Sequence, residues 1–225
     1  MTRLSVLACT ALAVSLSILG SSLTSCHFSG PVDRSLLTGE PCQPPCWQGL
    51  VPGVSTEQEV ENLIAVSEYV NPHRVYRERS GGATIISWES AVWSIARAQP
   101  NAFILDGDTL MVITHELDYE LTLEDLLARY GPPQKFWVRW RGWGTADVLV
   151  NLYYPAMGLV LELVLEPSDG YHELQPQNQV MRVWYCPGTS LEGFLDLGES
   201  IPFPPEEYME TDLHDWGGYG TVKPY

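Results

Sequence analysis

The sequence has little positive charge. Its 225 residues include 12 lysines and arginines against 28 aspartates and glutamates, which gives a formal net charge of −16 at pH 7. Such an acidic chain is a poor candidate for binding nucleic acid or an anionic lipid surface, because both are themselves negatively charged. The hydrophobic content of 45% and the eight tryptophans nevertheless indicate a packed core and exclude a disordered chain.

The sequence also lacks the motifs of common enzymes and metal sites. None of its histidines lies in a nucleophile motif such as Gly-x-Ser-x-Gly, and its many carboxylates show no glycosidase signature. Asp106-Gly107-Asp108 matches only the beginning of a calcium loop, so a plain turn is the better interpretation. We therefore predict a protein that is not an enzyme, with no catalytic residue, no cofactor and no metal.

The first 25 residues have the features of a signal peptide. Arg3 supplies a positive charge, and no charged residue occurs from residue 4 to residue 23. Leu23-Thr24-Ser25-Cys26 resembles the bacterial lipobox, in which a signal peptidase cleaves before a cysteine that carries a diacylglycerol. The resemblance implies a lipoprotein, with palmitate among its acyl chains, that is anchored through Cys26 to the cell membrane or outer membrane and lies outside the cytoplasm.

Cys9 belongs to the predicted signal peptide, and Cys26 is the predicted lipidation site. Three other cysteines are left to pair. They are Cys42, Cys46 and Cys186. Thiols outside the cytoplasm usually pair, and three cannot all pair within one chain. The local pair Cys42–Cys46 is slightly favoured, and a pair between Cys46 and Cys186 is the alternative. The Cys-x-x-x-Cys spacing does not fit a Cys-x-x-Cys redox motif, and the surrounding region lacks zinc ligands, so a structural role is expected.

Two segments begin with the same helix signals. Ser55 and Thr56 are both N-cap residues followed three positions later by Gln or Glu, so either can form a capping box, and Thr122 opens the second segment. Apolar residues then recur at helical spacing. The expected helices run from Ser55 to about Tyr69 and from Thr122 to Tyr130. The expected strands cover residues 73–79, 83–88, 102–105, 110–115, 135–141, 148–154, 159–165 and 180–186.

The two halves of the chain can be aligned with each other. Val60-Glu61-Asn62-Leu63-Ile64 corresponds to Leu123-Glu124-Asp125-Leu126-Leu127, and strands follow each helix in the same order. We therefore predict an α+β fold with two repeated modules, each a helix followed by an antiparallel sheet packed against it. The expected divisions are a signal peptide at 1–25, a lipidated tether with a cysteine pair at 26–46, modules at 47–120 and 121–188, and a tail at 189–225.

The predicted tail is acidic and rich in proline and glycine. Residues 191–225 contain eight acidic residues and one basic residue, and prolines at positions 202, 204 and 205 disfavour regular structure through the middle. We expect an extended segment that is partly disordered. Its aromatic residues also suggest that it packs against the rest of the protein.

The flanks of the two helices resemble a known family. The helix start at Gly53-Val54-Ser55-Thr56-Glu57 and the stop at Gly131-Pro132-Pro133 are similar to those of the SmpA/OmlA lipoproteins of the outer-membrane barrel-assembly machinery. Tandem versions also resemble the secreted β-lactamase-inhibitor proteins. The resemblance covers about a quarter of the chain and implies a small α+β fold that binds other proteins. No contact residue of those families can be transferred to this sequence.

A strand rich in tryptophan and arginine is the candidate binding surface. Strand alternation places Phe136, Val138 and Trp140 on one face, which suits the core. The predicted binding face consists of Trp137, Arg139, Arg141 and Trp143. Tryptophan and arginine dominate interface hot spots, although this face could instead be covered by the other module, with the arginines stacked on Trp137.

These features predict a membrane-anchored, non-enzymatic protein that binds or scaffolds an envelope protein. The alternative is a lipoprotein that binds glycans or small solutes through the same Trp/Arg face. Six of the 12 basic residues lie in the first strand after each helix, where they offset the acidic remainder of the chain: Arg74, Arg77, Arg79, Lys135, Arg139 and Arg141.

Overall fold

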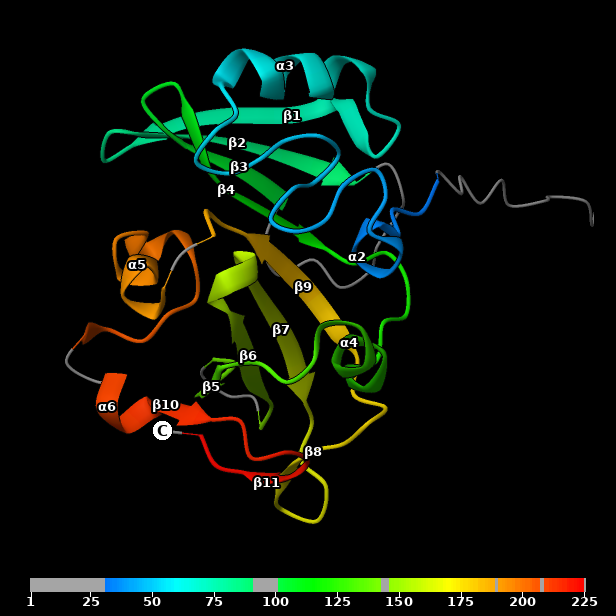
Figure 1. Cartoon of the computed structure of the whole chain (residues 1–225), viewed down its shortest axis with the longest axis vertical. Coiled ribbons are helices and arrows are strands. Elements are labelled where there is room, and N and C mark those ends of the chain that lie inside the picture. Colours follow the sequence, from blue (N-terminus) through cyan, green and yellow to red (C-terminus); the bar gives the residue numbers. More distant parts are fainter. Residues whose placement is uncertain (1–30, 91–100, 143–145, 189, 207–208, 225) are drawn as a thin grey trace, which may run out of the picture.

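The computed structural model describes residues 31–90, 101–142, 146–188, 190–206 and 209–224. Most of this structure is one antiparallel sheet of nine strands in the order β1-β2-β3-β4-β9-β7-β6-β5-β10 (Figure 1). Its strands are β1 (Val70–Ser80), β2 (Ala83–Ser90), β3 (Asn101–Asp106), β4 (Thr109–Glu116), β5 (Lys135–Trp140), β6 (Val148–Tyr154), β7 (Leu159–Leu165), β9 (Val180–Tyr185) and β10 (Leu213–Asp215). A separate pair is formed by β8 (His172–Leu174) and β11 (Gly220–Val222).

The predicted fold class, α+β with two repeated helix-plus-sheet modules, is wrong. The structure is 42% strand against 21% helix, and its strands belong mostly to a single sheet. The two expected sheets are joined because β4 pairs with β9, with Ile113 opposite Tyr185 and Glu116 opposite Arg182. Separate sheets would each leave an edge with unpaired backbone groups at this position, and the pairing removes both edges.

The individual elements agree more closely with the sequence. The two main helices are α3 (Glu57–Val66) and α4 (Leu123–Tyr130), and their N-caps, Thr56 and Thr122, both form capping boxes, as expected. Thr56 rather than Ser55 is the cap of α3, and the helix ends three residues earlier than predicted. Strands β6 and β7 have the predicted bounds. Of the described helices, none is both long enough and apolar enough to cross a membrane.

The sheet has an inner face that carries the main core. Val60 and Ile64 of α3 and Leu123 and Leu126 of α4 pack there. The same cluster includes buried residues of β1 to β7 and of β9, among them Val150, which is fully buried. Burial of these apolar side chains provides the main stabilisation of the fold. The opposite side, here called the outer face, carries a smaller apolar cluster around Tyr153, Val160 and Trp184.

The segment predicted as a tether is folded from its first described residues onward. A short helix, α2 (Ser35–Thr38), buries Leu36 in the main core. The Cys42–Cys46 disulfide follows, which confirms the favoured pairing, with an S–S distance of 2.09 Å. Cys186 is a buried free thiol, because its alternative partner Cys46 is already used.

The acidic C-terminal segment is also packed, in contrast to the extended tail that was expected. It contains two short α-helices, α5 (Leu191–Leu195) and α6 (Met209–Asp212), and ends in β10 and β11. Phe194 of α5 is fully buried in the cluster on the outer face. The hydroxyl of Tyr153 donates a 2.6 Å hydrogen bond to the carbonyl of Pro202. Figure 1 shows α5 on the opposite side of β7 and β9 from α4.

Candidate binding edge

The predicted Trp/Arg face is mostly tied into the fold. Trp137 packs against the apolar cluster on the outer face, and the guanidinium of Arg139 lies 5.5 Å from the centre of its ring. Arg141 forms a 3.1 Å ion pair with Asp147. Trp143 and the predicted lipidation site Cys26 lie outside the described residues. The face therefore provides less free surface than its composition suggests, because the C-terminal segment covers one part and ion pairs occupy another.

The expected core face of the same strand is also only partly buried. Val138 is buried and Phe136 is half-buried, as expected for inward-facing residues. Trp140 lies at the end of β5 and is 51% exposed, and its ring forms a T-shaped contact with that of His172. Trp140 is therefore the most exposed aromatic residue of β5.

A row of polar side chains crosses the outer face beside Trp137. Arg139 forms a 3.1 Å ion pair with Glu162, which also accepts a hydrogen bond from Asn151. Arg182, which is almost fully buried, forms a 2.9 Å ion pair with Glu116. Burial lowers the pKa of Arg182, while the nearby carboxylates of Glu116 and Glu162 raise it. These ion pairs join side chains of neighbouring strands, so the charged residues have a structural role.

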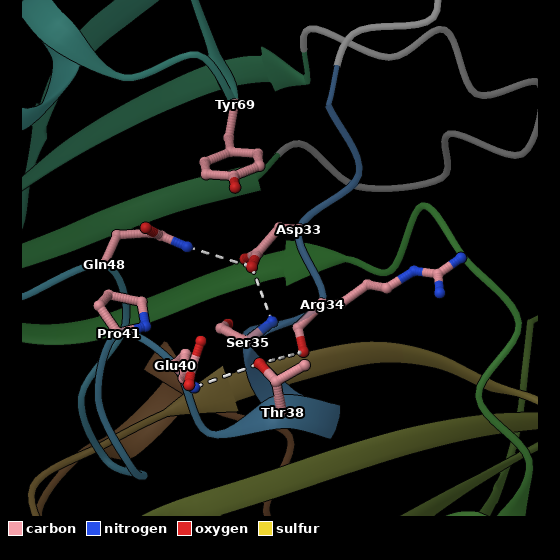
Figure 2. Close-up of a pocket in the computed structure, with 8 residues that line it drawn as sticks. All are labelled: Asp33, Arg34, Ser35, Thr38, Glu40, Pro41, Gln48 and Tyr69. Carbon is pink, nitrogen blue, oxygen red and sulfur yellow. Dashed lines mark hydrogen bonds between the residues drawn. The ribbon is translucent and has the colours of Figure 1, made fainter.

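A depression of about 640 Å³ lies beside α2 (Figure 2). Its central carboxylate, Asp33, accepts hydrogen bonds from the backbone N–H of Ser35, the side-chain amide of Gln48 and the indole N–H of Trp47. Figure 2 shows the carboxylate of Asp33 joined by hydrogen bonds to Gln48 and to Ser35, with the ring of Tyr69 drawn above it. Because three donors already surround this carboxylate, its main role is to fasten the N-terminal segment to the sheet.

The histidines and carboxylates form no recognisable reactive centre in the part of the chain that the structure describes. No three of the described His, Cys, Asp and Glu side chains are arranged to hold a metal ion. His115 is buried between Trp47 and Tyr185, and burial lowers its pKa. Burial likewise raises the pKa of the Cys186 thiol, so this thiol stays protonated and unreactive.

Strand β1, of 11 residues, lies at one end of the nine-stranded sheet and is therefore an edge strand. Nearly all its residues after Asn71 are exposed, and Tyr76 is 56% exposed. Among the described residues, no strand pairs with its outer edge. In Figure 1 this strand lies at the end of the sheet near α3.

The β1–β2 hairpin determines which backbone groups of β1 point outward. Gly81 and Gly82, both with positive φ, form a two-residue turn between Ser80 and Ala83. The pair that closes such a turn is hydrogen-bonded, and the direction alternates along the strand. Ser80, Glu78 and Tyr76 therefore point their N–H and C=O groups at β2. Arg79, Arg77 and Val75 point theirs at the outer edge.

Strand β1 is rich in arginine, and two of its arginines form ion pairs at the protein surface. Arg77 forms a bidentate ion pair with Glu61 of α3, with distances of 2.6 Å. Arg74 lies 3.7 Å from Glu89 of β2. Within the described residues, Glu78 has no ion-pair partner. The sequence did show the concentration of arginine in this strand, but only the order of strands in the sheet identifies it as an edge.

Comparisons with protein families, with curated proteins and with solved structures found no match to this chain.

Proposed function

We propose that this protein is a lipid-anchored, extracytoplasmic binding protein that engages a protein partner by strand addition at the outer edge of β1. The observation that supports this proposal is the long, exposed edge of a nine-stranded sheet, whose Val75, Arg77 and Arg79 backbone groups point away from β2. Unpaired N–H and C=O groups in a row form a template for another strand.

Three features support a protein partner over a small ligand. The backbone groups of β1 recur at strand spacing, which matches an extended peptide. The carboxylate in the depression beside α2 is already surrounded by three donors, and Trp137, the residue on which glycan binding would depend, packs against the sheet.

Replacing Arg77 by proline tests strand addition. Proline removes an N–H that points outward and does not bond to β2, so the sheet itself keeps its hydrogen bonds. Arg77→Ala is the matched control, because it removes the same side chain and the Glu61 ion pair but keeps the N–H. We expect Arg77→Pro to lose the partner in crosslinking and co-purification from intact cells, and Arg77→Ala to retain it.

Both variants should melt within a few degrees of each other, which shows that the sheet is intact. Retention of the same partner by Arg77→Pro would rule out strand addition at β1. Tyr76→Pro provides a further comparison, because the Tyr76 N–H points at β2 and its loss should lower thermal stability.

The anchor is tested separately. The lipobox resemblance assigns the acyl chains to Cys26, so Cys26→Ala should abolish incorporation of labelled palmitate and move the protein from the membrane fraction to the soluble fraction. Continued palmitate labelling of Cys26→Ala would show that the lipid lies elsewhere.

A further inference from the structure

We propose that the strand added at β1 is β1 of a second copy of this chain, so that the protein forms a two-fold symmetric dimer with one continuous sheet. This inference rests on the proposed function, because it uses the same edge and names its occupant. The two β1 strands would run antiparallel, with Tyr76 opposite Tyr76 of the second copy at the symmetry axis.

The charge pattern of β1 selects this register. Tyr76 and Glu78 lie on one side of β1, whose pairing with β2 is regular from Val75 to Ser80, and the same alternation continued by one residue places Arg74 there. The Arg74 guanidinium lies 3.7 Å from Glu89 of β2, and its side chain is 56% exposed, so a second copy can reach it. With Tyr76 on the axis, Arg74 of each copy lies opposite Glu78 of the other. Glu78 has no ion-pair partner among the described residues of its own chain, so the dimer would supply one, twice.

The backbone permits the same register. Val75 and Arg77 both point their N–H and C=O groups outward, and with Tyr76 on the axis they lie opposite each other in a hydrogen-bonded pair. A register centred on Arg77 would instead place two arginines opposite each other, which is unfavourable. The axis at Tyr76 therefore satisfies both the backbone and the charges.

The other end of the sheet is a poorer partner for β1. Strand β10 has only three residues, and Lys135 of its neighbour already pairs with Asp215 at 2.8 Å. Head-to-tail pairing of β1 with β10 would build an open chain of molecules with few backbone bonds at each contact. Pairing of β1 with β1 of a second copy uses the longer edge and gives a closed dimer.

Cysteine crosslinking in the full-length chain tests the register directly. At a directly opposed pair without hydrogen bonds the Cα atoms are about 4.5 Å apart, so Tyr76→Cys should form a disulfide-linked dimer under mild oxidation. Arg74→Cys and Glu78→Cys place like cysteines about 14 Å apart across the axis, so neither should crosslink alone, while a mixture of the two should. The unsubstituted chain provides the background.

A charge exchange gives an independent readout by analytical ultracentrifugation. Glu78→Arg places like charges opposite each other at two symmetric positions and should weaken the dimer by about tenfold. The double variant Arg74→Glu/Glu78→Arg restores opposite charges and should recover it. A monomer for the unsubstituted chain, or equal crosslinking at positions 74, 76 and 78, would overturn the proposal.

The failures of the two proposals can be distinguished. If Tyr76→Cys does not crosslink to itself but Arg77→Pro still loses a different protein, the edge binds a partner and the partner is not a second copy. If neither variant changes any association, strand addition at β1 fails altogether. Concentration-dependent polymers in place of dimers would indicate head-to-tail pairing and would also overturn the two-fold arrangement.

Discussion

Replacing Phe194 by alanine tests whether the acidic C-terminal segment belongs to the folded protein. Phe194 is fully buried, and its ring lies 6.3 Å from that of Tyr153 and 6.0 Å from that of Phe203. It thereby connects the short helix α5 to the outer face of the sheet. Loss of this contact should leave a cavity between the segment and the sheet.

The expected cost follows from the burial. Phenylalanine-to-alanine changes in a core cost about 3–5 kcal/mol, and α5 is short enough to collapse partly into the space, so we expect about 3 kcal/mol. For a protein of this size each kcal/mol lowers the melting temperature by about 2–4 °C, which gives a shift of about 6–12 °C. Tyr171→Ala is the matched control, since this aromatic residue is 65% exposed and should change stability little.

Thermal unfolding and limited proteolysis measure the two consequences together. Phe194→Ala should melt earlier than Tyr171→Ala and should be cleaved faster within residues 190–224, because α5 is no longer held against the outer face. If both variants melt at the same temperature and are cleaved at the same rate, the segment is not packed as described and the argument from burial fails.

Two further predictions concern the N-terminal half of the fold. The double variant Cys42→Ser/Cys46→Ser should lower the free energy of unfolding by about 2 kcal/mol, because the disulfide closes a short loop with a sequence separation of 4. Urea unfolding with and without reductant measures this difference. Reductant should destabilise the unsubstituted chain and leave the double variant unchanged. The pKa of His115 is lowered by burial below its unfolded value of about 6.5, so the unfolded chain binds more protons in acid and stability should fall as the pH drops below that value. His115→Gln should show a smaller fall between pH 7.5 and 5.5 than the exposed control His73→Gln, and equal falls would contradict this assignment.

Local elements could be predicted well because their signals are local. The capping boxes at Thr56 and Thr122 involve residues three positions apart, and the turn at Gly81-Gly82 involves only its own backbone. The Cys42–Cys46 pair was favoured for the same reason, because the two residues are close in sequence. Such interactions are visible in a one-dimensional pattern.

The Trp/Arg face of β5 had two interpretations from the sequence, a binding face or a face covered by other parts of the chain with the arginines stacked on Trp137. Trp137 and Arg139 were predicted to form an exposed binding face, because hot-spot residues alternate with apolar ones in that strand. The structure places Glu162 against Arg139 and the C-terminal segment against the cluster that contains Trp137. Both partners come from segments that are distant in sequence, so no spacing within the strand could show that these positions were already used.

The two main helices, most strands, the turns and the local disulfide could be predicted from the sequence alone, since each depends on residues within a few positions of one another. The acidic character of the chain also follows directly from the sequence. The pairing of β4 with β9 to make one sheet, and the position of β1 at the edge of that sheet, became visible in the folded structure and not before. Strand neighbours are chosen by competition among many strands of similar apolar pattern, and that choice depends on backbone pairing and shared burial between segments far apart in the chain.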